Sequence, residues 1–214
     1  MAKLYFRYGT VGSSKTLNLL ATAHNYRRQH KRVVLVKPGL DTRGNGERTV
    51  ASRAGLEQEA DIVLDNDTEW RDEWVCDSDC VLVDEAQFLS VEHVEELRRI
   101  VDEFNVPVIC YGLRTDFRTR LFDASKRLME LADSIEEIKT TCHYCNRKAT
   151  CSMRVDGDGS TGTLVGPTIQ MGFEELYLAV CFAHFRLETC VELGRNASSS
   201  IIERQAGGNE QVSD

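Results

Sequence analysis

The segment that decides the fold is Tyr8-Gly9-Thr10-Val11-Gly12-Ser13-Ser14-Lys15-Thr16. A short aromatic and apolar run at residues 4–8 precedes the turn, and leucines at helix-like spacing follow it. This order predicts a buried strand, a glycine turn and a helix. Because the first turn of a helix presents unpaired N–H groups and the positive end of its dipole, we interpret the segment as a cradle for the phosphates of a nucleoside triphosphate.

The spacing matches the motif G-x-x-x-x-G-K-[ST] with one departure, since Ser14 stands where the second glycine is expected. In such a loop Lys15 would neutralise charge on the β- and γ-phosphates, and the Thr16 hydroxyl would ligate Mg²⁺. Ser14 should keep a negative φ, because its Cβ disfavours the left-handed region. The alternative is an ordinary glycine–serine turn that caps a helix. The preceding strand and the Lys15-Thr16 pair favour phosphate binding.

The composition is that of a soluble globular chain, with 214 residues of which 42% are apolar and 28% charged. This length suits one α/β core with a small appended module. No apolar run is long enough to span a bilayer, and the N-terminus lacks the apolar core of a signal peptide, so we expect a cytoplasmic protein without a membrane partner. The net charge of −8, without a basic cluster, argues against a nucleic-acid partner.

Helix and strand patterns alternate along the first two thirds of the chain. We predict helices at residues 15–30, 91–104 and 121–131, and buried strands at residues 33–36, 106–113 and 135–138. The polar segment 45–58 has no clear assignment, and residues 61–64 form at most a short strand. The pattern predicts a parallel sheet of five or six strands with helices on its faces. Asp41 and Arg43 follow the strand at 33–36 at the ligand-binding edge, where a solvated turn is the alternative.

A second informative segment, at residues 79–88, is an apolar strand that ends in Asp84 and Glu85. This is a Walker-B pattern, in which the aspartate reaches Mg²⁺ and an adjacent carboxylate handles the proton of the nucleophile. Successive side chains of a strand point in opposite directions, so we assign Asp84 to the metal side and Glu85 to the other side. A charged turn is the alternative, but two phosphate-site motifs in the expected order support each other.

The composition changes after residue 140, where Cys142 and Cys145 form one pair and Cys181 and His184 form another across a glycine-rich loop. Two pairs with this spacing predict a tetrahedral Zn²⁺ site of three thiolates and one imidazole, rather than unrelated buried cysteines. Four protein ligands fill the coordination shell, so the metal should be structural. His143 is a competing nitrogen, but it is poorly placed to act together with Cys142.

These motifs, taken with Gly112-Leu113-x-x-Asp116-Phe117 and a closing Tyr177, resemble the thymidine kinases of the cytosolic type over residues 2 to about 190. The resemblance implies a RecA-like P-loop α/β core at 1–140 and a small zinc-containing domain at 141–192. A lasso-like loop of that domain would cover the nucleoside, and residues 193–214 would form a disordered tail.

The resemblance also implies roles for individual residues. Glu85 would be the general base for the thymidine 5′-hydroxyl, and Thr16 and Asp84 would be associated with Mg²⁺. Main-chain groups between Leu164 and Phe173 would hold the thymine, although Phe173 stands where the family commonly has glycine. The nucleoside would contact Phe88, Phe117, Met171, Gly172 and Tyr177. The ATP phosphates would be bound by Gly9, Thr10, Val11, Gly12, Ser13, Ser14, Lys15, Thr16, Arg43, Asp84, Glu85, Ala86 and Gln87.

The implied activity is ATP-dependent phosphorylation of thymidine, and of deoxyuridine, to the 5′-monophosphate, a salvage step for DNA synthesis. The resemblance further implies a homotetramer and binding of thymidine triphosphate in the site. Two alternatives remain open. One is a zinc-ribbon binding module that a nucleotide regulates without phosphorylation, and the other is a P-loop kinase for a different nucleoside.

Overall fold

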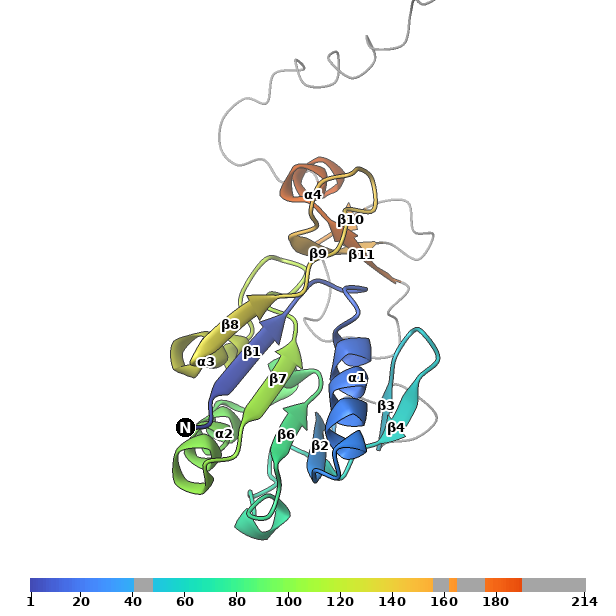
Figure 1. The fold of residues 1–214 in the computed structure, drawn as a ribbon. Coiled ribbons are helices and arrows are strands. Elements are labelled where there is room, and N and C mark those ends of the chain that lie inside the picture. Colours follow the sequence, from blue (N-terminus) through green and yellow to red (C-terminus); the bar gives the residue numbers. More distant parts are fainter. Residues whose placement is uncertain (41–47, 156–161, 165–175, 190–214) are drawn as a thin grey trace, which may run out of the picture.

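The core of the computed structural model is a six-stranded sheet, and the structure describes residues 1–40, 48–155, 162–164 and 176–189 (Figure 1). Every neighbouring pair of its strands is parallel, in the order β5-β2-β6-β7-β1-β8. The prediction of a parallel sheet of five or six strands is therefore confirmed. The strands are β1 (Leu4–Tyr8), β2 (Val33–Pro38), β5 (Ile62–Leu64), β6 (Cys80–Val83), β7 (Val108–Gly112) and β8 (Ser134–Glu137).

Apolar side chains fill both faces of this sheet, as near-continuous apolar strands require. Leu19 and Ala23 of α1 (Lys15–Arg28) pack on one face against a cluster that includes Leu35. On the opposite face, α2 (Val91–Phe104) and α3 (Asp123–Leu131) cover the cluster that includes Phe6 (Figure 1). The phosphate loop thus begins at the end of β1, between the layer formed by α1 and the layer formed by α2 and α3.

The helix boundaries differ from prediction by at most two residues. Residues 91–104 form α2 as expected, whereas α1 ends at Arg28 and α3 begins at Asp123. The polar segment that the sequence left unassigned contains an antiparallel hairpin of β3 (Thr49–Ala51) and β4 (Glu57–Glu59). Two short 3₁₀ helices, η1 (Asp72–Trp74) and η2 (Ala86–Phe88), complete the elements before residue 140. Strands of three residues are too short to give a period that sequence analysis can detect.

A second sheet lies beyond the carboxyl ends of the core strands (Figure 1). It consists of β9 (Cys151–Val155) between β10 (Gly162–Thr163) and β11 (Tyr177–Val180), and α4 (Phe182–Glu188) follows. Its own small apolar cluster contains Met153, Val180 and Phe185. The predicted domain boundaries stay predictions, and residues 193–214 lie outside the described part of the chain. Within the described ranges, no helix combines the length and apolar character of a membrane span.

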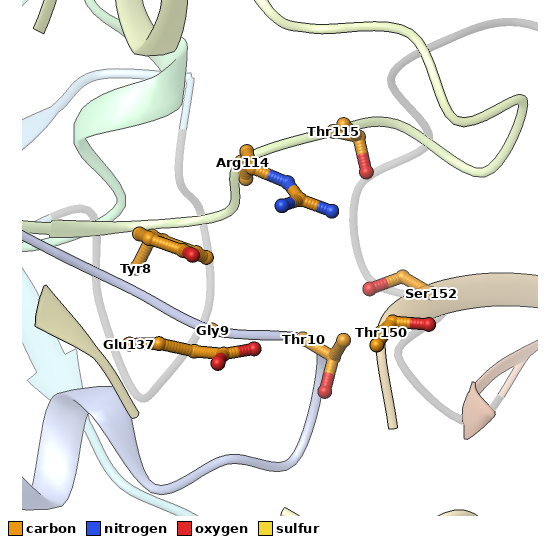
Figure 2. Close-up of a pocket in the computed structure, with 8 residues that line it drawn as sticks. All are labelled: Tyr8, Gly9, Thr10, Arg114, Thr115, Glu137, Thr150 and Ser152. Atoms are coloured by element: carbon orange, nitrogen blue, oxygen red, sulfur yellow. The ribbon is translucent and has the colours of Figure 1, made fainter. Parts of the chain in front are cut away.

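A small polar pocket lies where the second sheet approaches the phosphate loop (Figure 2). Ser152 of β9 and Thr150, which directly precedes β9, line it on one side, and Gly9 and Thr10 of the loop line it on the other. Its other walls are formed by Tyr8, Arg114, Thr115 and Glu137. The two sheets therefore meet at the start of the phosphate loop.

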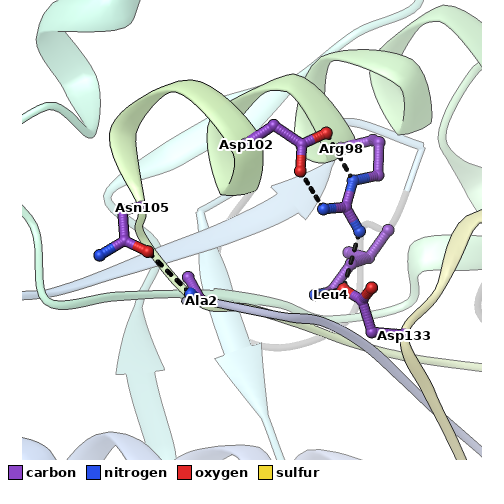
Figure 3. Close-up of polar contacts among 6 residues, drawn as sticks. All are labelled: Ala2, Leu4, Arg98, Asp102, Asn105 and Asp133. Carbon is purple, nitrogen blue, oxygen red and sulfur yellow. Dashed lines mark hydrogen bonds and ion pairs between the residues drawn. The ribbon is translucent and has the colours of Figure 1, made fainter.

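Polar contacts tie α2 to the amino end of β1 (Figure 3). The Arg98 guanidinium donates to Asp133 over 2.7 Å and also pairs with Asp102. The same Asp133 oxygen accepts the backbone N–H of Leu4 over 2.8 Å. The Leu4 backbone contact and the Arg98 charge both lower the pKa of Asp133. This carboxylate therefore joins α2 to β1.

We expect Asp133→Asn to lower the free energy of unfolding by about 1 kcal/mol at neutral pH, since it removes a partly exposed, charge-assisted contact. The folded-state pKa lies below the unfolded one, so the contribution is complete above about pH 5 and is lost as pH falls through the folded pKa. Urea titrations at pH 7 and pH 3 measure both effects. Asp102→Asn, which leaves the Leu4 contact intact, is the matched control. An equal loss of unfolding free energy at both pH values would show that the charge of Asp133 is not the cause.

Candidate functional site

The phosphate loop at residues 9–16 closes on itself at the carboxyl end of β1. The Gly9 N–H donates to the Gly112 carbonyl over 3.2 Å, and the Lys15 ammonium donates to the Thr10 carbonyl over 2.9 Å. A Cβ on Gly9 would lie 2.6 Å from the Ile138 carbonyl oxygen, a backbone atom that cannot rotate aside, so only glycine fits there. The Lys15 ammonium therefore lies inside the loop, at the amino end of α1.

Two buried hydroxyl groups of this loop support anion binding. Within the described part of the chain, Thr10 Oγ1 and Ser13 Oγ are buried and have no hydrogen-bond partner. Buried polar atoms are nearly always paired in native proteins, so unpaired hydroxyls beside a lysine indicate a polar ligand. The residues present thus fit the phosphates of a nucleotide.

The prediction of a negative φ for Ser14 is wrong. Ser14 is the N-cap of α1 with φ 64° and ψ 29°, and its side chain makes no cap hydrogen bond. The entry of the loop into the helix requires left-handed backbone at this position, whatever residue occupies it. Serine carries the steric cost that glycine would avoid.

We therefore expect Ser14→Gly to keep activity and to raise the free energy of unfolding by about 1 kcal/mol, the strain relieved less the entropy that glycine loses on folding. Ser14→Ala is the control, because it removes the hydroxyl but keeps the Cβ. Denaturant titration of both variants measures the difference. A gain in Ser14→Ala equal to that in Ser14→Gly would show that backbone strain is not the cause.

Thr16 and Asp84 meet although they are distant in sequence. The Thr16 hydroxyl lies 3.1 and 3.2 Å from the two Asp84 carboxylate oxygens. Asp84 is only 1% exposed, and its N–H donates to the Val36 carbonyl of the adjacent strand. A hydroxyl and a carboxylate are oxygen ligands of the kind that Mg²⁺ prefers, so this pair fits the predicted ion.

Glu85 has a different partner from Asp84. Its carboxylate accepts from the Gln87 amide over 2.5 Å, and the Gln87 carbonyl oxygen accepts the Leu113 N–H over 2.8 Å. A Cβ on Gly112 would lie 2.7 Å from that Gln87 oxygen, so glycine is required for the approach. Gln87 therefore links the Glu85 carboxylate to the end of β7.

Strand alternation cannot assign the two carboxylates, because the chain turns where they lie. The strand β6 ends at Val83, and Glu85 adopts left-handed backbone with φ 46° before η2 begins. Side-chain alternation thus does not extend to these residues. Their separate partners, Thr16 for Asp84 and Gln87 for Glu85, support different roles instead. Strained backbone at a buried acid is common at functional sites.

The aromatic residues expected to contact the nucleoside fall into two pairs. The rings of Phe117 and Tyr177 lie edge to face at 6.5 Å, and those of Phe88 and Phe122 at 5.9 Å. Burial raises the pKa of Tyr177, against the opposing charge of Arg154. Sequence analysis missed Phe122, which lies just before α3. Arg43, Met171 and Gly172, like Asp41 and Phe173, lie outside the described residues.

The four predicted zinc ligands converge at the second sheet. The ligand atoms of Cys142, Cys145, Cys181 and His184 all lie within 4.8 Å of one another. His184 Nδ1 is 3.3 Å from Cys181 Sγ and 3.4 Å from Cys142 Sγ. Ligand atoms around a tetrahedral Zn²⁺ are separated by about 3.5–3.8 Å, as its bond lengths dictate. The residues present fit this ion, and His143 is not part of the set.

The electrostatics of the three thiols also favour a cation. Burial opposes ionisation of Cys142, but backbone N–H groups and His184 lower its pKa to about 6. The pKa of Cys145 is raised instead: a backbone contact at Arg147 favours its thiolate, but burial and the neighbouring thiols outweigh that contact. Neighbouring thiolates repel one another, so a positive ion between Cys142 and Cys145 would favour the ionised form of both.

We expect purified protein to contain one Zn²⁺ per chain and Cys145→Ser to lose it. The second sheet has a small core of its own, so loss of the metal should unfold it before the six-stranded sheet. Elemental analysis and the protease sensitivity of each sheet measure these effects. Cys151→Ala, a change in the same sheet outside the ligand set, should keep the metal. Zinc-free wild-type protein, freshly purified, would refute the assignment.

Sequence analysis missed three further residues near the loop. Arg53, in the β3–β4 hairpin, has a guanidinium nitrogen 3.6 Å from the place a Gly12 Cβ would occupy. Lys37 is fully buried, and its ammonium donates to the Thr49 carbonyl at the base of that hairpin. Ser152 accepts the Val11 N–H over 3.1 Å. Of these three residues, only Lys37 could have been found from the sequence, because it is a charged residue that directly follows a predicted buried strand. Arg53 and Ser152 carry no such signal.

The parallel sheet, the phosphate loop and the buried carboxylate facing Thr16 together define a P-loop nucleotide-binding protein with a RecA-like core. A sequence model of the thymidine kinase family matches residues 2–185. A thymidine kinase of Lactococcus lactis is 47% identical over 189 residues, which cover 86% of this chain and 97% of that protein. A thymidine kinase of Streptococcus gordonii is 45% identical over 188 residues, covering 86% and 96% respectively. The chain belongs to the thymidine kinase family, which confirms the resemblance.

Proposed function

We propose that this protein transfers the γ-phosphate of ATP to the 5′-hydroxyl of thymidine. Membership of the thymidine kinase family supports this reaction. The structural observation that carries the proposal is the pair of consecutive buried carboxylates, Asp84 and Glu85, with separate partners. A nucleotide switch needs only the first, so the regulated zinc-ribbon module does not account for Glu85.

Catalysis would rest on positioning and charge neutralisation. Backbone N–H groups of the loop and the Lys15 ammonium would bind the phosphates. Thr16 and Asp84 would hold Mg²⁺, which when bound neutralises charge on the phosphate oxygens. Burial of Lys15 and Asp84, at 6% and 1% exposure, strengthens these interactions by excluding water.

Glu85 would accept the proton of the 5′-hydroxyl as that oxygen attacks. The Gln87 amide donates to one oxygen of this carboxylate, Oε2, and so orients it. The pairs Phe117–Tyr177 and Phe88–Phe122 are apolar walls suited to a nucleoside. Zn²⁺ would hold the second sheet together and take no part in proton or phosphate transfer.

We further propose that the protein also accepts deoxyuridine and acts as a cytoplasmic homotetramer, without a nucleic-acid or membrane partner. The family resemblance and the acidic net charge of −8 support these assignments. A coupled assay with ATP, Mg²⁺ and a panel of nucleosides tests the substrate, and light scattering of the purified protein tests the assembly. Preference for a purine nucleoside would overturn the substrate proposal.

Glu85→Gln should lower kcat by roughly 10²–10⁴, the usual contribution of a positioned general base. Shape and polarity are kept, so the affinities for ATP and thymidine should stay within a few-fold of wild type. Steady-state kinetics with thymidine, together with equilibrium binding, measure both.

Asp84→Asn is the matched variant on the neighbouring carboxylate, and it should instead raise the Mg²⁺ concentration needed for half-maximal rate. Turnover of Glu85→Gln at the wild-type rate would remove the general-base role from Glu85. It would leave a different base or the switch to be considered.

A further inference from the structure

The peptide group between Thr10 and Val11 makes contacts at both of its ends. Its carbonyl oxygen accepts the Lys15 ammonium over 2.9 Å and the Ser13 N–H over 3.3 Å. Its N–H donates to the Ser152 hydroxyl oxygen over 3.1 Å. We propose that Ser152 is a positioning residue that fixes this peptide and, through it, the Lys15 ammonium.

Peptide planarity carries the effect from one end of the group to the other. In a trans peptide the N–H and C=O bonds lie in one plane and point in opposite directions. An N–H held by Ser152 therefore keeps the Thr10 oxygen directed at Lys15. If the N–H were free, the plane could rotate about its flanking single bonds, and the oxygen would leave the ammonium.

Ser152 is held by contacts that do not involve the loop. It is 4% exposed and is the second residue of β9, where it pairs with Ala179 of β11. Its neighbours Cys151 and Met153 are buried in the apolar cluster of the second sheet. The acceptor is thus fixed in place before any ligand arrives, as a positioning group must be.

The position of the contact within the loop explains why it would affect ATP rather than thymidine. Val11 lies on the loop itself, whereas the aromatic pairs proposed for the nucleoside lie on other segments. This inference rests on the proposed function, since Lys15 is there assigned to the ATP phosphates. Loss of one neutral hydrogen bond that orders a cation should weaken ATP binding by about three- to tenfold.

Calorimetric titration with a non-hydrolysable ATP analogue and Mg²⁺ tests the proposal. Ser152→Ala should bind the analogue about three- to tenfold more weakly, with a matching rise in KM for ATP and an unchanged KM for thymidine. Ser152→Thr keeps the hydroxyl and should restore the affinity. Thr150→Val is the control, because Thr150 lines the same pocket (Figure 2) but has no hydrogen bond to the loop.

A double-mutant cycle shows whether Ser152 acts through Lys15. In a Lys15→Ala background, titrated to higher analogue concentrations, Ser152→Ala should cause little further loss. An equal loss with and without Lys15 would overturn the mechanism, as would a Ser152→Ala chain with wild-type affinity or an equal defect in Thr150→Val. If the wild-type chain did not bind the analogue, the proposed function would fail as well.

Discussion

Burial of two consecutive carboxylates at the end of a parallel sheet constrains the rest of this structure. An ionised group removed from water must be paired or hydrogen-bonded, or it loses its charge. Thr16 meets this requirement for Asp84, and this contact ties α1 to the end of β6. Gln87 meets it for Glu85, and the absence of a side chain at Gly112 makes room for Gln87. The need to pair two buried carboxylates thus fixes contacts among α1, β6, η2 and β7.

Two strained residues flank this region, and both are left-handed without being glycine. Ser14 opens α1 beneath the loop, and Glu85 turns the chain after β6. Such backbone persists only when the surrounding contacts outweigh its cost. For Glu85 the compensating contact is the hydrogen bond that its carboxylate accepts from the Gln87 amide. For Ser14 the side chain makes no cap hydrogen bond, so the shape of the loop imposes the left-handed backbone there.

The sequence predicted those features that repeat or that follow fixed spacing. Continuous apolar runs located β2, β6 and β7, because a strand buried on both faces needs apolar residues at every position. The cysteine spacing located the metal ligands, since tetrahedral geometry limits how two pairs can approach. The φ of Ser14, the Gln87 bridge and the Ser152 contact could not be predicted. Each depends on a partner brought close by tertiary structure, and no local pattern marks it.

The position of β1 within the sheet also affects the order in which the chain can fold during synthesis. Leu4 and Tyr5 belong to β1, which precedes the other five strands of its sheet in the chain, yet they pair with Val108 on one side and Ser134 on the other. Both partners emerge from the ribosome more than a hundred residues later. Until then Phe6 and its neighbours have no partner strand, and exposed apolar strands of this kind aggregate readily. Completion of the sheet must therefore wait for β8, so β1 stays unpaired while most of the six-stranded core is being synthesised.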